Sequence, residues 1–124
     1  MKTILDDGRS IYLQISESVE DDILAGVIQE EELLPSKIQF AKHFQINPAT
    51  AMKGVNLLVD EGIVYKKRGI GMCVATGARE IIMKKRRQSF YDNYVAVLKT
   101  EAAKLGISKS ELIKMIESEE TNDK

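Results

Sequence analysis

The chain of 124 residues is 44% hydrophobic and 30% charged, with a formal net charge of −1 at pH 7 and one cysteine. This length allows one small domain and a short appendage and excludes a second ligand-binding domain of ordinary size, while a lone cysteine excludes an internal disulfide. Because no long apolar run and no secretory leader are evident, the sequence predicts a cytoplasmic protein without a membrane partner.

The first predicted helix runs from Ser10 to about Val27. Its apolar residues recur at four-residue steps and should line one core-facing side: Ile11, Ile15, Val19, Ile23 and Val27. Residues 29–33 then form an acidic connector. Its three consecutive glutamates, residues 30–32, would repel phosphate, and we expect a solvated loop.

Two short helices joined by a tight turn are predicted next. Pro35 and Ser36 introduce the first helix, and residues 45–46 form the turn. The residues of this helix that should face the core are Ile38, Ala41 and Phe44. So short a connection makes the two helices cross steeply.

The second helix of this pair should begin at Pro48. Asn47 can cap its free N–H groups, and proline fits the first helical position without losing a hydrogen bond. Three- and four-residue steps predict a core-facing stripe of Ala51, Val55, Leu58 and Val59. The residues left facing outward are Ala49, Thr50, Met52, Lys53 and Asn56.

The following segment predicts a β-hairpin with a basic tip. Residues 63–65 and 72–74 are apolar and rich in β-branched or aromatic side chains, which is typical of paired strands. The tip combines glycine, which permits close backbone approach, with cations that attract phosphate: Lys66, Lys67, Arg68, Gly69 and Gly71. The alternative is an ordinary surface hairpin with a solvated charge run.

Positive charge is concentrated in and just after this hairpin. Residues 62–90 carry eight Lys or Arg and one Glu, whereas residues 1–61 carry five basic and eleven acidic residues. Residues 91–124 carry five basic and seven acidic residues. A local basic patch is what phosphate contact requires, whatever the charge of the whole chain.

After the hairpin, a long helix is predicted from Ala78 to about Lys104, with Gly106 as its stop. A second helix should start at Ser108, which can form a capping box with Glu111. Two such helices cannot hide all of their apolar residues by themselves. We expect these residues to meet a second copy in a twofold dimer: Phe90, Tyr91, Tyr94, Val95, Leu98, Leu105, Leu112, Ile113 and Ile116. The alternative is that the two helices fold back on the preceding domain.

Together these elements predict a mainly α fold with a small β-hairpin wing. Residues 1–76 form a winged helix-turn-helix domain for DNA binding, and residues 77–124 form a two-helix hairpin for dimerisation. In this fold the second helix of the pair enters the major groove and the wing lies along the adjacent minor groove.

Four segments together resemble the GntR family of bacterial transcription regulators: residues 34–36, 46–50, 58–64 and 68–74. Residues 11–15 also match the first helix of that family, and the Asn-Pro-x-Thr variant at residue 47 resembles its YtrA-like subfamily. The resemblance implies a double-stranded DNA operator as partner, a short helical tail for dimer contact, and repression of neighbouring transporter genes.

The chain also departs from the family pattern. Lys37 and Ile38 stand where an arginine is usual, and Pro48 and Met52 replace arginines common in the recognition helix. Ile70 replaces the basic residue often found between the wing glycines. The usual bidentate guanine contacts are therefore missing, which implies either a different operator or weaker specificity.

Roles for the DNA-binding residues follow from their positions. Ser36 and Lys37 should hold phosphate. Thr50, Lys53 and Asn56 should face base edges or backbone, and Met52 or Ala49 should touch thymine methyl groups. Asn47 and the five tip residues, 66–69 and 71, complete the expected DNA contact. The predicted protein is a homodimeric repressor on a palindrome-like operator.

Catalysis and metal binding are disfavoured by the sequence. His43 and Cys73 are the only residues of their types, and nothing local brings them together as base and nucleophile. No spacing typical of zinc or calcium ligands occurs, so no cofactor, metal or enzymatic activity is predicted. An unidentified small-molecule effector is left open. The alternative function is a winged helix used for protein contacts, with weak DNA binding indifferent to sequence.

Overall fold

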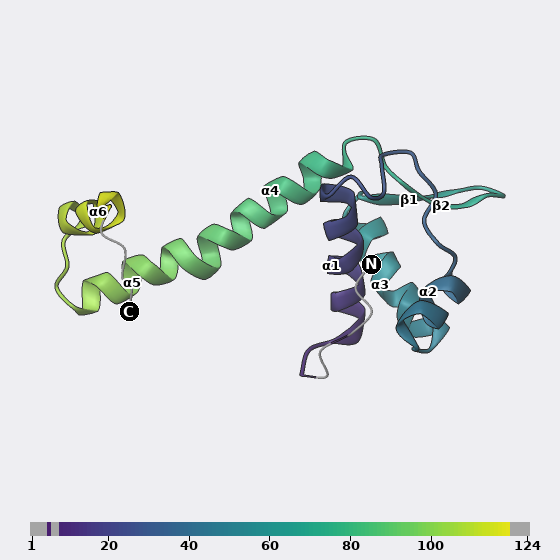
Figure 1. Cartoon of the computed structure of the whole chain (residues 1–124), viewed down its shortest axis with the longest axis horizontal. Helices are drawn as coiled ribbons and strands as arrows, with labels where there is room; N and C mark the ends of the chain where they lie inside the picture. The colour runs from purple at the N-terminus through teal and green to yellow at the C-terminus, as the bar shows by residue number, and fades with distance from the viewer. Residues whose placement is uncertain (1–4, 6–7, 120–124) are drawn as a thin grey trace. The chain divides into compact units, whose positions relative to one another are not determined.

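The computed structural model describes residue 5 and residues 8–119. Its elements follow the order shown in Figure 1: α1 (Ile11–Leu24), α2 (Lys37–Phe44), α3 (Pro48–Asp60), β1 (Val64–Lys67), β2 (Gly71–Val74), α4 (Ala78–Phe90), a π-helical turn (Tyr91–Val95), α5 (Ala96–Lys104) and α6 (Lys109–Glu117). The expectation of a mainly α fold with a small antiparallel hairpin is confirmed. In this described part of the chain, no helix has both the length and the apolar character needed to cross a bilayer.

The chain divides into two compact units, Met1–Lys84 and Lys85–Lys124. The first two turns of α4 belong to the first unit, because Ala78 and Ile82 are fully buried in its core. Helix α4 therefore runs across the division. The functional boundary expected after residue 76 stays a prediction.

Helix α1 lies against the core through Ile15, Val19 and Ile23, as the sequence predicts. The expected end at Val27 is wrong, since the helix stops at Leu24 and Val27 is 63% exposed. Gly26 adopts a φ of 79°, which turns the chain so that Ile28 enters the core instead.

Helix α2 begins with the capping box of Ser36. The Ser36 hydroxyl accepts from Gln39 N at 3.1 Å, and Gln39 Oε1 accepts from Ser36 N at 2.7 Å. This start directs Phe40, Ala41 and Phe44 inward. The expectation that Ile38 is buried is wrong, because it lies about 200° around the helix from Phe40 and is 67% exposed.

Helix α3 begins at Pro48 as predicted, with Asn47 Oδ1 accepting from Ala49 N at 2.7 Å. Ala51, Val55 and Leu58 are buried, and Val59 is half-buried at the edge of the core. The helix crosses α1 closely at Gly54, whose carbonyl accepts from the Ser16 hydroxyl at 2.5 Å.

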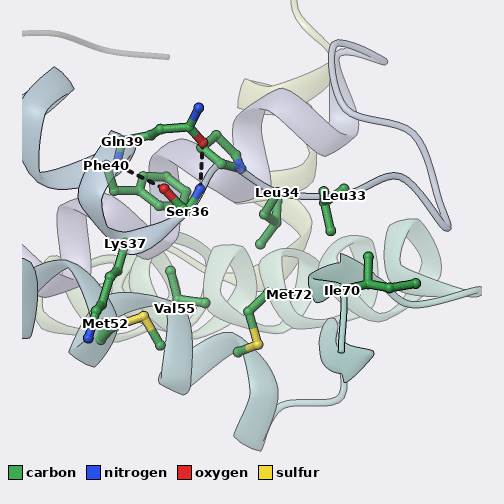
Figure 2. A pocket seen from close by; sticks show the side chains of 12 residues that line it. Leu33, Leu34, Ser36, Lys37, Gln39, Phe40, Met52, Val55, Ile70 and Met72 are labelled. Atoms are coloured by element: carbon green, nitrogen blue, oxygen red, sulfur yellow. Dashed lines mark hydrogen bonds between the residues drawn. The ribbon is translucent and has the colours of Figure 1, made fainter. Parts of the chain in front are cut away.

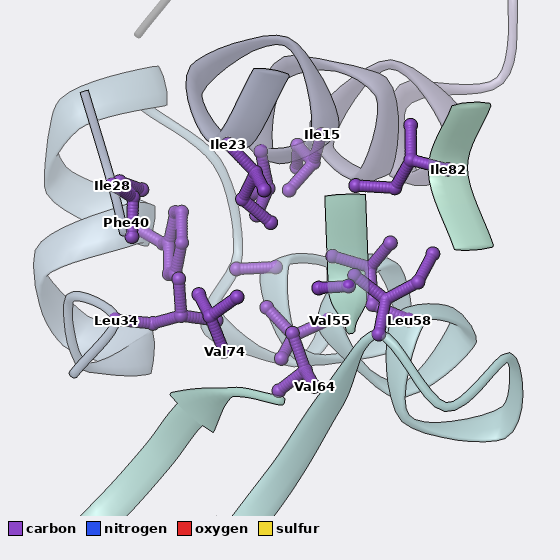
Figure 3. Packing of buried hydrophobic residues seen from close by; sticks show 14 of the residues in the cluster. Ile15, Ile23, Ile28, Leu34, Phe40, Val55, Leu58, Val64, Val74 and Ile82 are labelled. Atoms are coloured by element: carbon purple, nitrogen blue, oxygen red, sulfur yellow. The ribbon is translucent and has the colours of Figure 1, made fainter. Parts of the chain in front are cut away.

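The hairpin pairs Val64 with Val74 and Lys67 with Gly71, so β1 is longer than predicted and includes two of the cations. Figure 3 shows Val64 and Val74 packed in one cluster with residues of α1, α3 and α4, including Ile82. The hairpin is thus anchored in the core at its base.

The acidic connector is an exposed loop, as expected from the sequence, but its backbone is also paired with the hairpin. Leu33 forms a bridge with Cys73, and Leu34 N donates to Met72 O at 2.8 Å. Val74 N in turn donates to Glu32 O at 3.0 Å. The connector therefore lies beside β2, where its backbone continues the hydrogen bonding of the hairpin.

The second unit holds the tail from Lys85 onward. The predicted limits of the long helix, Ala78 and Lys104, are confirmed, although a π-helical turn interrupts it. Ser108 caps α6 through the expected capping box with Glu111. Of the residues assigned to the dimer interface, Val95 and Leu112 are half-buried. The others are exposed: Phe90, Tyr91, Tyr94, Leu98, Leu105, Ile113 and Ile116.

Candidate nucleic-acid interface

One face of α3 is open to solvent. Ala49, Lys53 and Asn56 are exposed, and their spacing of four and three residues places them on the same side of the helix. Thr50 and Met52 are partly exposed at the two edges of this face. The five outward residues predicted from the sequence thus line one surface, with Ala49, Lys53 and Asn56 at its centre.

Lys53 and Met52 point to different neighbours. The Lys53 ammonium lies 4.1 Å from the centroid of the Tyr12 ring, which restrains the side chain beside α1. Met52 instead borders a hollow that lies toward α2 and the hairpin. The base contacts expected for both residues stay predictions.

The hollow, of about 280 Å³, lies between the start of α2, helix α3 and the hairpin. Figure 2 shows Lys37 and Met52 at one end of it and Ile70 at the other. Its lining is largely apolar: Leu33, Leu34, Pro35, Ser36, Lys37, Gln39, Phe40, Met52, Val55, Ile70, Gly71 and Met72. The three elements expected to contact DNA therefore border one concave surface.

The cations of the hairpin do not form a single cluster. Successive residues of a strand face opposite sides, so Lys66 shares a side with its partner Met72, which borders the hollow. Lys67 lies on the other side of the hairpin, the side of Tyr65, whose hydroxyl bonds Glu31. Lys66 is thus the strand cation on the same side as the hollow.

Glutamates 30 and 31 hold the base of the hairpin to the connector. The Tyr65 hydroxyl donates to Glu31 Oε1 at 2.5 Å, and the Thr76 hydroxyl donates to Glu31 Oε2 at 2.7 Å. Both bonds hold the pKa of Glu31 below its ordinary 4.5, and the bond to Glu31 raises the pKa of Tyr65 to about 12. Glu30 accepts from Gly77 N and Arg79 N, and those two bonds lower its pKa.

Glu30 supplies the N-terminal cap of α4 from a distant segment. Because Gly77 precedes that helix and has no side chain, a cap must come from elsewhere. This missing local cap is the signal in the sequence that could have indicated a structural role for an acidic residue. The sequence reading missed it.

Arg79 belongs to the basic segment, but its guanidinium is bonded to the end of α1. Its guanidinium donates to Ile23 O at 2.9 Å and to Leu24 O at 2.7 Å, at the carboxyl end of α1. A cation at this end of a helix satisfies free carbonyl groups and is favoured by the helix dipole. Arg79 therefore stabilises the fold, and the positive charge of residues 62–90 does not all lie at the hairpin.

The two residues considered for catalysis lie in separate settings. Cys73 is buried in β2, and His43 is exposed on α2 with its ring 4.8 Å from that of Phe44. Over the residues with a described placement, no group of three His, Cys, Asp or Glu could hold a metal ion. Nothing in this part of the chain joins the two into a nucleophile and base.

Comparison with known proteins agrees with this geometry. Residues 11–74 match the family described as bacterial regulatory proteins, gntR family. The HTH-type transcriptional repressor NagR of Bacillus subtilis is 35% identical over 65 residues, which are 52% of this chain and 27% of NagR. The chain thus spans about a quarter of the length of that relative.

Solved structures resemble a larger part of the chain. A putative transcriptional regulator of the GntR family from Bacteroides thetaiotaomicron has a TM-score of 0.73 and 38% identity, covering 86% of this chain and 92% of its own. YtrA from Sulfolobus acidocaldarius, a GntR-family transcription factor, has a TM-score of 0.56 and 26% identity, covering 94% and 92%. The DNA-binding domain of AraR in complex with operator ORX1 has a TM-score of 0.52 and 25% identity, covering 60% and 92%.

Proposed function

This chain belongs to the GntR family of bacterial regulatory proteins, and we propose that it regulates transcription by binding a double-stranded DNA operator. The observation that carries the proposal is the exposed face of α3, flanked by the capped start of α2 and by a hairpin with a glycine-containing, cationic turn. A recognition helix enters the major groove, and a thin basic hairpin beside it suits the adjacent minor groove. The similarity to a domain solved on its operator supports the same partner.

The proposed contacts divide into positioning and reading. Ser36 and Lys37 at the start of α2, and the hairpin residues Lys66, Lys67, Arg68, Gly69 and Gly71, bind the backbone. Asn47, Ala49, Thr50, Met52, Lys53 and Asn56 face the bases or the adjoining backbone. Phosphate contacts fix the register, whereas base edges supply sequence preference.

The chain acts as a homodimer in this proposal, joined by its tail. Exposed aliphatic and aromatic residues from Phe90 to Ile116 supply the contact surface. Two copies engage two half-sites of a palindrome-like operator and gain affinity from each other. The similarity to YtrA and to a named repressor supports a YtrA-like repressor, and the resemblance adds transporter genes as targets.

A DNA-binding role places the protein with the bacterial chromosome, and it requires no catalysis. The relatives are named as transcriptional regulators and repressors, which act by binding. A small-molecule effector stays a prediction.

Binding of the full chain to the duplex upstream of its own gene tests the proposal. Fluorescence anisotropy at two salt concentrations, against a scrambled duplex, should show preferential and salt-sensitive binding with two protomers per site. Equal and feeble binding to both duplexes would favour a winged helix that contacts an acidic protein.

Two variants separate positioning from reading. Lys66→Ala should weaken binding to all duplexes alike, because one phosphate contact is lost. The slope of log affinity against log salt concentration should become shallower by about one unit. Asn56→Ala should reduce the free energy of binding to the preferred duplex by about 1–3 kcal/mol, and that to the scrambled duplex by much less. Equal losses on the two duplexes would refute base reading by Asn56.

A further inference from the structure

The turn of the hairpin presents one aliphatic side chain. Ile70 is 60% exposed, and its backbone N–H donates to Lys67 O at 3.0 Å to close the turn. Gly69 and Gly71 flank it with φ of +78° and +142°, values that L side chains rarely adopt. Ile70 therefore projects from a thin backbone with no side chain on either neighbour.

The surroundings of Ile70 are cationic, but Ile70 itself cannot form a polar contact. Lys66, Lys67 and Arg68 are exposed on the same hairpin and can bind the phosphates that border a groove. The minor groove is about 6 Å wide, so a turn without flanking side chains suits it. An apolar side chain at this point would lie against the base pairs or the sugars that wall the groove.

Base pairs differ in the minor groove by one group. A·T and T·A pairs show acceptors alone, whereas a G·C pair adds the N2 amino donor of guanine. An aliphatic side chain against that amino group removes it from water and offers no acceptor in return, which is unfavourable. The same side chain against an A·T pair leaves no donor unpaired.

We infer that Ile70 makes the hairpin selective for A·T pairs in the minor groove. The inference rests on the proposed DNA-binding function and adds a specificity-determining residue to it. The preference of Ile70 for A·T pairs is independent of the bases that α3 reads in the major groove. A competing explanation is that Ile70 packs against Leu33, which borders the same hollow.

The test changes the minor groove alone. A duplex recovered from a random library by selection with the full chain is prepared with 2,6-diaminopurine in place of adenine, which adds an N2 amino group. A second version carries inosine in place of guanine, which removes that group. Neither change alters the hydrogen-bonding edge in the major groove, so contacts of α3 are kept.

We expect the unmodified chain to lose affinity about tenfold on the diaminopurine duplex, as one unpaired donor would cause. Binding to the inosine duplex should be equal or tighter. Ile70→Asn, whose amide oxygen can accept from the added amino group, should lose most of this discrimination. Val27→Asn is the matched control, because Val27 is a 63% exposed aliphatic residue outside the hairpin, and it should discriminate as the unmodified chain does.

Four results would overturn the inference. Equal losses for the unmodified chain and Ile70→Asn, or no loss for the unmodified chain, would remove Ile70 from minor-groove reading while leaving DNA binding intact. A lower unfolding temperature of Ile70→Asn with the same discrimination would establish packing on Leu33 instead. If the unmodified chain selects no duplex at all, the proposed function fails and the inference fails with it.

Discussion

Tyr65, Glu31 and Glu30 illustrate how single polar residues position the candidate interface. Glu31 receives bonds from the hairpin at Tyr65 and from the chain beyond it at Thr76, while Glu30 caps α4. These carboxylates join the connector, the hairpin and the first turn of α4. The hairpin is held at its base while its turn, with two glycines, is left to meet a ligand.

Lowering the pH should weaken this link. The pKa of Glu31 is lowered in the folded chain, so its stabilisation is present above the ordinary value of 4.5 and is lost as the pH falls through the lower folded value. Glu31→Gln should therefore be less stable than the unmodified chain at neutral pH and approach it in acid. Urea unfolding over this pH range measures the difference.

Glu32→Gln is the control for that experiment, because the Glu32 carboxylate accepts from Gln29 N inside the connector and not from the hairpin. Its difference from the unmodified chain should stay small at neutral pH. A gap between Glu31→Gln and the unmodified chain that persists unchanged in acid would contradict the role of the ionised carboxylate.

At the level of elements, the starts of helices could be predicted from the sequence, but the bonds that join one element to another could not. Asn47 and Ser108 cap helices through bonds two and three residues away, so local sequence contains the signal. Glu31 bonds residues 34 and 45 positions away, and no periodicity reports such a pairing. Ile38 was misassigned because an apolar residue on a short helix does not reveal which side the core occupies.

The candidate site shows the same limit. The outward face of α3 follows from helical spacing, and the turn of the hairpin follows from its glycines, which adopt positive φ. The placement of Lys53 over Tyr12 and the hollow beside Met52 arise where separate elements meet, and they could not be predicted. Departures at Ile38 and Ile70 were visible in the sequence, but their exposure required the structure.

Helix α3 can lie close to α1 because residue 54 lacks a side chain. A Cβ there would stand 2.7 Å from Tyr12 O and 3.0 Å from Ile15 Cγ2, and the first of these is backbone that cannot rotate away. Gly54→Ala should therefore destabilise the fold by about 1–3 kcal/mol, despite the higher helix propensity of alanine. Urea unfolding measures this change in the free energy of unfolding.

Asn56→Ala is the control for Gly54→Ala, since Asn56 is exposed on the same helix and also gains helix propensity, by a smaller amount. Its stability should equal or slightly exceed that of the unmodified chain. If Gly54→Ala were equally stable, the close crossing of α1 and α3 would not constrain residue 54.

At the scale of the whole molecule, the tail leaves many large apolar residues exposed. Tyr94 is 65% exposed, Leu105 76% and Ile116 67%. A groove of about 410 Å³ between α5 and α6 adds apolar surface lined by Ala102, Ile113 and other residues. So many exposed large apolar residues on a short helical segment are typical of protein contacts, which favours a second copy over solvent.

Leu98→Lys tests the dimer at this scale. Leu98 is 42% exposed on α5, and a charge there should oppose burial against a second copy, so sedimentation velocity should show a shift toward monomer. Affinity for a duplex with two half-sites should fall by about a hundredfold or more, because the two bound domains are no longer linked. Affinity for a single half-site should be unchanged.

Thr100→Lys, exposed on the same helix and outside the proposed interface, should stay dimeric. The fold-back alternative gives a different pattern: the unmodified chain would sediment as a monomer, and Leu98→Lys would lower its unfolding temperature without changing its mass. Affinity for a single half-site depends on the DNA-binding domain alone. A loss of that affinity would therefore indicate damage to this domain and not to the dimer. The two duplexes thus separate a failed interface from a failed fold.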